Sequence, residues 1–276
     1  MLAKALQLAA AGNASIAWPD ISTASHVRFD TINNGTNDIY GLFFKPDGTK
    51  VYTVEITTDS IIETTLSTPW DISTHGSADY TLTTNQTNNT APSGLFFKKN
   101  GEEMYVIDTV DDTVCQYSLT TGWDLSTASY TRNFSVASQE TTPRDVSFSP
   151  DGLNMYVVGW SSDKIHRYTL TTAWDISTAS HDSSSALLTD LFTPSGVFLK
   201  EDGTRIYSVG RNRQRIEQYN LSTPYDLSTG TFTTADSTLS VSSEETLPYV
   251  VFISPDGSHL YLGGGTGHGV DQYSLG

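Results

Sequence analysis

The sequence is poor in positive charge, in cysteine and in long apolar runs. Its 276 residues hold 15 Lys and Arg against 31 Asp and Glu, a net charge of −16. So acidic a surface repels phosphate backbones, and we expect no nucleic-acid binding. Cys115 is the only cysteine, which excludes an intrachain disulfide and leaves stability to packing. No apolar run reaches the roughly 18 residues of a membrane-spanning helix, so no membrane insertion is expected.

Signatures of familiar enzyme classes are missing as well. The sequence contains no Gly-x-Ser-x-Gly and no His-Glu-x-x-His pattern, which mark serine hydrolases and zinc peptidases. The glycine-rich stretch 263–269 lacks the Lys-Ser/Thr pair and the helix of a phosphate-binding loop, so we interpret it as a turn. These absences favour a binding or structural protein over an enzyme.

The sequence does contain a regular repeat. An aromatic residue followed by Asp-Ile/Leu-Ser-Thr recurs with small changes, and the aromatic residue stands at positions 18, 70, 123, 174 and 225. A second phrase, an apolar segment, a turn and a segment ending in tyrosine, keeps the same spacing. Its copies begin at Gly41, Gly94, Asp145, Gly196 and Val250. A period of about 50 residues is typical of propellers and solenoids, in which each repeat is one structural unit.

Each repeat unit predicts four short strands. In the unit from residue 40 to residue 90, we expect strands at 42–44, 50–55, 61–66 and 78–82, separated by turns rich in Gly, Asp and Ser. No helical pattern interrupts them, so the sequence predicts an all-β propeller with four-stranded antiparallel blades. The recurring Trp and Tyr are expected to pack between blades.

The two ends of the repeat predict how the ring closes. The last unit ends at a third strand, and residues 17–31 contain the missing aromatic-Asp phrase and a fourth strand. We therefore expect one domain, residues 17–276, forming a single five-bladed β-propeller whose fifth blade is closed by the N-terminal strand. Residues 1–16 lie outside the repeat and are expected to be a tail or short helix that serves as a docking peptide. A secretory signal and a frayed terminus are the alternatives.

Positions that differ between blades are the candidate functional residues, because packing positions recur in every blade. The informative positions precede the first strand or follow the second strand of a blade, which places them on one face of the ring. The candidate ligand-binding residues are Tyr40, Tyr249, Trp160, Arg144, Arg211 and Arg213. We expect the aromatic rings to stack on sugar faces and the arginines to bond to hydroxyl groups.

Acidic residues on the same face suggest a second interpretation. Glu55, Asp108 and Asp145 are the candidate metal ligands, since carboxylate oxygens suit Ca²⁺ or Mg²⁺ in the channel. A third interpretation is a polar loop surface without a ligand. No other cofactor is expected.

The repeat resembles a known group of sequences. Its clearest copies are Tyr117–Tyr130, Asn133–Pro143 and Phe148–Gly159. They are similar to the WDIST-repeat β-propeller proteins of marine bacteriophage and environmental sequences, and the opening MLAKALQLAAAGN looks like the start of marine phage virion proteins. The resemblance implies a virion-associated structural or adhesin protein of a tail or fibre, with no catalytic residues to transfer.

The leading prediction is therefore a non-enzymatic phage virion protein. We expect it to join other virion proteins through its N-terminal segment, to attach to a host receptor or surface glycan, and to form a homo-oligomer in the assembly. The first alternative is a propeller hydrolase or lactonase with a central divalent cation. The second is a secreted lectin.

Overall fold

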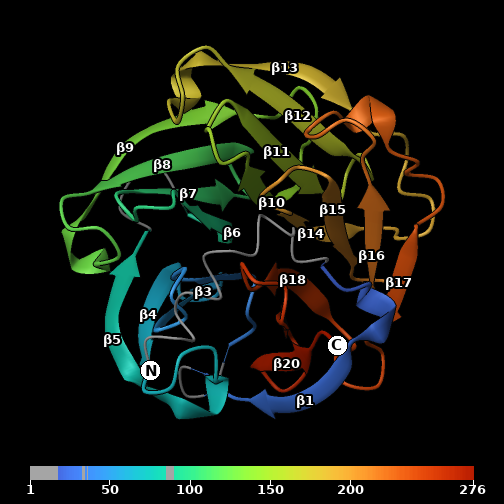
Figure 1. Cartoon of the computed structure of the whole chain (residues 1–276). Coiled ribbons are helices and arrows are strands. Elements are labelled where there is room, and N and C mark those ends of the chain that lie inside the picture. The colour runs from blue at the N-terminus through green and yellow to red at the C-terminus, as the bar shows by residue number, and fades with distance from the viewer. Residues whose placement is uncertain (1–17, 33–34, 36, 85–89) are drawn as a thin grey trace, which may run out of the picture.

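The chain forms a ring of five sheets around a central channel (Figure 1). This computed structural model describes residues 18–32, 35, 37–84 and 90–276. Every sheet has four antiparallel strands, which confirms the predicted five-bladed β-propeller. The predicted docking segment, residues 1–16, lies outside the described residues. Within the described part of the chain, no helix is long and apolar enough to cross a membrane.

Four blades are continuous in sequence, and their strands run from the channel outwards in chain order. The first two blades are β2 (Gly41–Phe44), β3 (Lys50–Glu55), β4 (Ser60–Leu66) and β5 (His75–Thr83), then β6 (Pro92–Phe97), β7 (Glu103–Asp108), β8 (Thr113–Leu119) and β9 (Ala128–Ser135). The next two are β10 (Pro143–Phe148), β11 (Asn154–Gly159), β12 (Ile165–Leu170) and β13 (Ala179–Ser184), then β14 (Pro194–Leu199), β15 (Arg205–Gly210), β16 (Arg215–Asn220) and β17 (Ser237–Ser240).

The fifth blade is shared by the two ends of the described chain. It contains β18 (Pro248–Ile253), β19 (His259–Gly264) and β20 (Val270–Ser274), and its outermost strand is β1 (Ser25–Asp30). β1 pairs antiparallel with β20, from Ser25 opposite Ser274 to Asp30 opposite Val270. The His26 Nε2 atom also lies 2.9 Å from the Asp271 Oδ1 atom across this pair. The predicted closure by the N-terminal strand is therefore confirmed.

The core lies between neighbouring blades rather than inside one layer. The second strand of each blade is buried on both faces, as in β3, where every residue from Val51 to Glu55 is buried. Strands covered on both faces need no alternation of apolar and polar residues, which explains the continuous apolar runs of the repeat. The outermost strands are mostly exposed, as β5 is.

The recurring aromatic residues fill the gaps between blades, as predicted. Trp70 adopts a left-handed backbone conformation (φ 66°) and lies on the hairpin turn of its own blade. A Cβ atom on Gly48 would lie 2.4 Å from the Trp70 ring, so this turn needs glycine. The Tyr52 hydroxyl donates a hydrogen bond of 2.7 Å to the carbonyl oxygen of Trp123 in the next blade. The repeat thus encodes both the blades and the contacts between them.

Candidate functional site

Five of the six predicted ligand-binding residues come together at one end of the channel. The rings of Tyr40 and Tyr249 stack with centroids 4.3 Å apart. The guanidinium carbon of Arg144 lies 3.4 Å from the centroid of the Trp160 ring. Arg211 lies between the two aromatic groups, its guanidinium carbon 5.1 Å from Trp160 and 5.7 Å from Tyr249. We call these five residues the arginine–aromatic cluster.

The local fold explains why these side chains meet. Tyr40 immediately precedes β2, and Arg144 and Tyr249 are the second residues of β10 and β18, all innermost strands. Trp160 and Arg211 immediately follow β11 and β15, which pair with innermost strands. All five positions therefore lie at the same end of the channel. The sixth candidate is outside the cluster, because the guanidinium carbon of Arg213 lies 4.9 Å from the centroid of the Phe192 ring.

The two arginines of the cluster carry unpaired positive charge. Among the described residues, neither Arg144 nor Arg211 forms an ion pair, and the buried Nε atom of each has no hydrogen-bond partner. Burial, together with the nearby Arg211 charge, lowers the pKa of Arg144 from its ordinary value, while the neighbouring tyrosines and Glu140 oppose this shift. Buried polar groups in folded proteins are nearly always hydrogen-bonded. Two unpartnered guanidinium groups side by side are therefore suited to an anion.

A hydrogen bond fixes the central ring of the cluster. The Trp160 Nε1 atom donates to the Ser195 hydroxyl at 3.0 Å. Ser195 is the residue of β14 that corresponds to Arg144 of β10, one blade further along. Because both guanidinium groups lie near this ring, the bond also determines where their N–H groups are held.

A histidine–aspartate pair adjoins the cluster. The His268 Nδ1 atom lies 2.7 Å from Asp38 Oδ1, and the Tyr249 hydroxyl donates to Asp38 Oδ2 at 3.5 Å. A carboxylate oxygen accepts only, so the His268 Nδ1 atom is the donor in this contact. Sequence analysis did not single out Asp38, because it lies in the link from β1 to β2, whose sequence differs from those of the corresponding links of the other blades.

The predicted metal ligands are not brought together. Glu55 accepts hydrogen bonds from Asn37 and Thr58, at 2.9 and 3.1 Å. Asp108 instead accepts backbone N–H bonds from the turn that follows it, including one of 2.9 Å from Val110. No group of three or more His, Cys, Asp or Glu that could hold a metal occurs among the residues whose placement the structure describes. Within the described residues, Glu55, Asp108 and Asp145 thus form no three-ligand group, and a channel cation stays a prediction.

The reason is that a carboxylate at this position is structural in four of the five blades, whereas in the fourth blade Leu191 lies beside Gly210 instead. Where Gly159 replaces Glu55 or Asp108, the side chain of Glu140 occupies the space, and a Cβ atom on Gly159 would lie 2.6 Å from its carboxyl carbon. Glu140 accepts the backbone N–H groups of Thr142 and Ser161, both at 2.9 Å. In the fifth blade, Glu245 fills the corresponding space beside Gly264. In the third and fifth blades, a glycine at this position therefore goes with a carboxylate that another segment supplies.

Comparisons with known proteins support the fold. Neither a family model nor a curated protein matches the chain. A solved structure named as a candidate 6-phosphogluconolactonase, from Bacteroides fragilis, is 15% identical with a TM-score of 0.50, and the match covers 79% of this chain and 59% of the other. A nidogen–laminin complex is 18% identical with a TM-score of 0.55, covering 87% and 76%. A protein of unknown function from Desulfotomaculum acetoxidans is 13% identical with a TM-score of 0.52, covering 86% and 68%.

These similarities correct the leading functional prediction. At identities of 13 to 18% they show the fold alone, and the chain spans about three fifths of the length of the lactonase candidate. No phage or virion protein is named among them, and the neighbour that has a named activity is an enzyme candidate. The prediction of a non-enzymatic attachment function is therefore contradicted by the enzyme candidate among these neighbours, while likeness at these identities assigns no activity to this chain.

Proposed function

We propose that the arginine–aromatic cluster binds a small organic anion. The observation that carries this proposal is the pair of buried Nε atoms on Arg144 and Arg211 that lack a hydrogen-bond partner. Guanidinium groups bind carboxylate and phosphate through two parallel N–H bonds, and these are among the strongest hydrogen bonds in proteins. The stacked rings of Tyr40 and Tyr249 provide an apolar surface for the body of the same ligand.

The protein's charge makes this site selective. The whole chain has a net charge of −16, so an anion is repelled by most of the surface. Arg144 and Arg211 are adjacent and unpaired, which makes their neighbourhood the favourable place for a negative group. An anion that binds there also relieves the cost of leaving the two Nε groups without an acceptor.

Calorimetry with a defined anion tests the proposal. We use 6-phosphogluconate, which carries a phosphate and a carboxylate, and glucose as its uncharged counterpart. Wild-type protein is expected to bind the anion and not glucose, and Arg144→Gln or Arg211→Gln is expected to weaken binding about 10- to 100-fold. Arg213→Gln is the matched control, because Arg213 stacks on Phe192 outside the cluster. Equal binding by all three variants would overturn the proposal.

A second candidate function is hydrolysis of an anionic lactone. It is favoured by the His268–Asp38 pair, whose Nδ1–Oδ1 distance is 2.7 Å, beside the proposed anion site. The name of the Bacteroides fragilis neighbour also denotes a lactonase that acts on a phosphorylated sugar lactone. We infer that the cluster holds the anionic group while the pair acts on the ring ester.

The pair would act as a general base. His268 Nε2 takes a proton from water as the water oxygen attacks the lactone carbonyl carbon, and Asp38 stabilises the imidazolium that forms. The ring C–O bond then breaks, the imidazolium returns the proton to the leaving oxygen, and the product is the open hydroxy acid. The two guanidinium groups keep the substrate in place during both steps.

Lactone opening releases acid, so it is measured by pH-stat against the spontaneous rate of 6-phosphogluconolactone. His268→Gln is expected to lower kcat/KM by roughly 10²- to 10⁴-fold while 6-phosphogluconate binding persists. Arg213→Gln should leave the rate unchanged. A wild-type rate no faster than the spontaneous reaction would reject the hydrolase and leave the anion site standing. The resemblance to phage propellers, the virion location and the virion partners stay predictions.

A further inference from the structure

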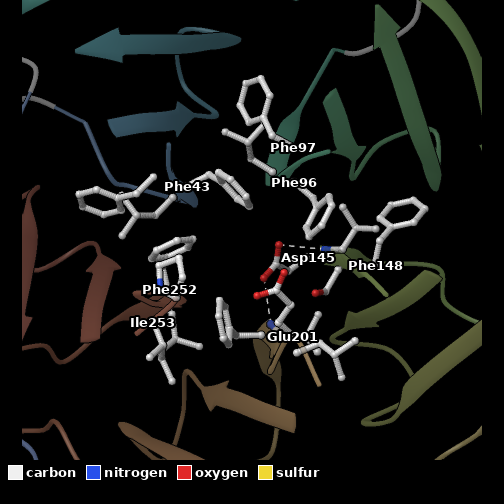
Figure 2. A pocket seen from close by; sticks show the side chains of 18 of the residues that line it. Phe43, Phe96, Phe97, Asp145, Phe148, Glu201, Phe252 and Ile253 are labelled. Atoms are coloured by element: carbon white, nitrogen blue, oxygen red, sulfur yellow. Dashed lines mark hydrogen bonds between the residues drawn. The ribbon is translucent and has the colours of Figure 1, made fainter. Parts of the chain in front are cut away.

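The other end of the channel is a separate, apolar cavity of about 390 Å³. Equivalent residues of the innermost strands line it, namely Phe43, Phe96, Phe198 and Phe252. Neighbouring ring centroids lie 5.5 Å apart for Phe43 and Phe96, 5.3 Å for Phe43 and Phe252, and 5.5 Å for Phe198 and Phe252. The rings thus form an arc around the channel axis, open at the third blade (Figure 2).

The third blade departs from the pattern at both channel-facing positions of β10. Ser147 stands where the other blades have phenylalanine, and Asp145 stands where they have glycine or valine. Alternate residues of a strand share a face, so both polar side chains belong to the same wall of the cavity. A fifth phenylalanine at position 147 would close the arc and separate Asp145 from the cavity.

Asp145 lacks the charged partner that a cationic ligand would supply. The Asp145 carboxylate accepts backbone N–H bonds of 2.9 Å from Val146 and Val197, but among the described residues it has no cationic neighbour. Ser147 is 4% exposed and lines the same pocket. Figure 2 shows the Asp145 side chain reaching the middle of the pocket.

The rim of the cavity adds no free positive charge. Lys99 lines the pocket, but its ammonium group lies 2.5 Å from the carboxylate of Glu201, which lines it too. The cavity therefore combines apolar walls, one buried carboxylate, one hydroxyl and an acidic protein around them. Without a cation, burial raises the pKa of Asp145 and keeps its carboxyl group protonated, and a cationic group beside it would favour the charged form.

We propose that this cavity binds an organic ammonium ion with a compact apolar body. The ammonium group donates hydrogen bonds to the Asp145 carboxylate and the Ser147 hydroxyl, and the apolar body lies among the four phenylalanine rings. The volume is within the range of about 300–1,000 Å³ that is usual for small-molecule sites. This site is distinct from the arginine–aromatic cluster, takes a ligand of opposite charge and opens at the opposite end of the channel.

Calorimetry with three ligands of one shape tests the proposal. The probes are 2-phenylethylammonium, 2-phenylethanol and 3-phenylpropionate, and tryptophan fluorescence reports binding because Trp18 and Trp174 line the cavity. The ammonium probe is expected to bind at least about tenfold more tightly than the alcohol, and the carboxylate not at all. Equal or tighter binding of the alcohol or the carboxylate, or no binding of any probe, overturns the proposal.

Variants locate the site. Ser147→Phe fills the opening in the arc and is expected to abolish binding, while Ser147→Ala keeps the space and lowers affinity only a few-fold. Asp145→Asn is expected to remove the preference for ammonium over alcohol. Arg144→Gln should leave ammonium binding unchanged, which separates this result from that for the anion site. Unchanged binding in a folded Ser147→Phe variant overturns the proposal even if Asp145→Asn does not fold.

Discussion

The two ends of the channel are formed by the same five innermost strands, yet their chemistry is opposite. At one end, residues that differ from blade to blade bring Arg144, Arg211 and three aromatic rings together. At the other end, four blades repeat one phenylalanine and a single blade replaces it with Ser147. The first end is thus made by variation in the connections, and the second by one exception within the repeat. A repeat fold gains a site in either way without a change in its scaffold.

The two ends meet at Asp145, next to Arg144 in β10. Its carboxylate oxygen Oδ1 lies against Gly94 of the preceding blade, where a Cβ atom would be 2.2 Å away. The contact explains why that innermost strand has glycine at this position. A substitution at this contact should therefore affect both ends of the channel, whereas a substitution within one end should affect that end only.

Of the variants that test this comparison, Gly94→Ala is expected to have the largest effect on the free energy of unfolding. The added Cβ atom would lie 2.3 Å from the Asp145 Cα atom, so the backbone must move, and we expect a loss of about 3 kcal/mol or more in the free energy of unfolding. Urea denaturation measures it. Gly76→Ala is the control, because its Cβ atom would be 3.8 Å from the nearest atom. A similar stability of the two variants would show that the contact with Asp145 does not require glycine at position 94.

The second prediction concerns pH. Burial raises the pKa of Asp145 to about 8 from 3.8, against the effect of the backbone N–H groups of Val197, Val146 and Leu95. The folded protein therefore holds this proton more tightly than the unfolded chain, and the free energy of unfolding should fall as pH rises from about 4 to about 8. Asp145→Asn should remove the part of this pH dependence that comes from Asp145, which denaturation curves between pH 4 and pH 8 measure. Identical pH profiles would contradict a buried, protonated Asp145.

The sequence predicts the fold almost completely because the same strand and turn pattern occurs five times. The blade number and the closure by β1 follow from where the aromatic-Asp phrase occurs and where it is missing. The ligand-binding candidates were found by the same reasoning, since Tyr40, Arg144 and Tyr249 occupy equivalent positions that differ between blades.

Contacts made by links whose sequences differ from blade to blade were not predictable in this way. Asp38 lies in the link from β1 to β2, and the corresponding links of the other blades have different sequences, so no repeated pattern indicates its contact with His268. In the third blade the position equivalent to Glu55 is Gly159, and Glu140, from another part of the unit, supplies the carboxylate there. A comparison of equivalent positions therefore made a structural carboxylate look variable. The cavity was missed because Phe43 and its equivalents read as core residues covered on both sides.

The smallest expected effect is that of removing the Trp160 ring, which lies against the arginines of the anion site. Trp160→Leu removes the ring 3.4 Å from Arg144 and should cost about 1 kcal/mol of stability and weaken 6-phosphogluconate binding several-fold. Phe192→Leu is the matched control, since it removes the ring beneath Arg213, with a distance of 4.9 Å, without touching the cluster. Thermal unfolding and calorimetry on both variants measure the difference. Because Trp160 contacts only one end of the channel, binding of 2-phenylethylammonium at the other end should be the same in both variants, and a loss there would show that the two ends are not independent.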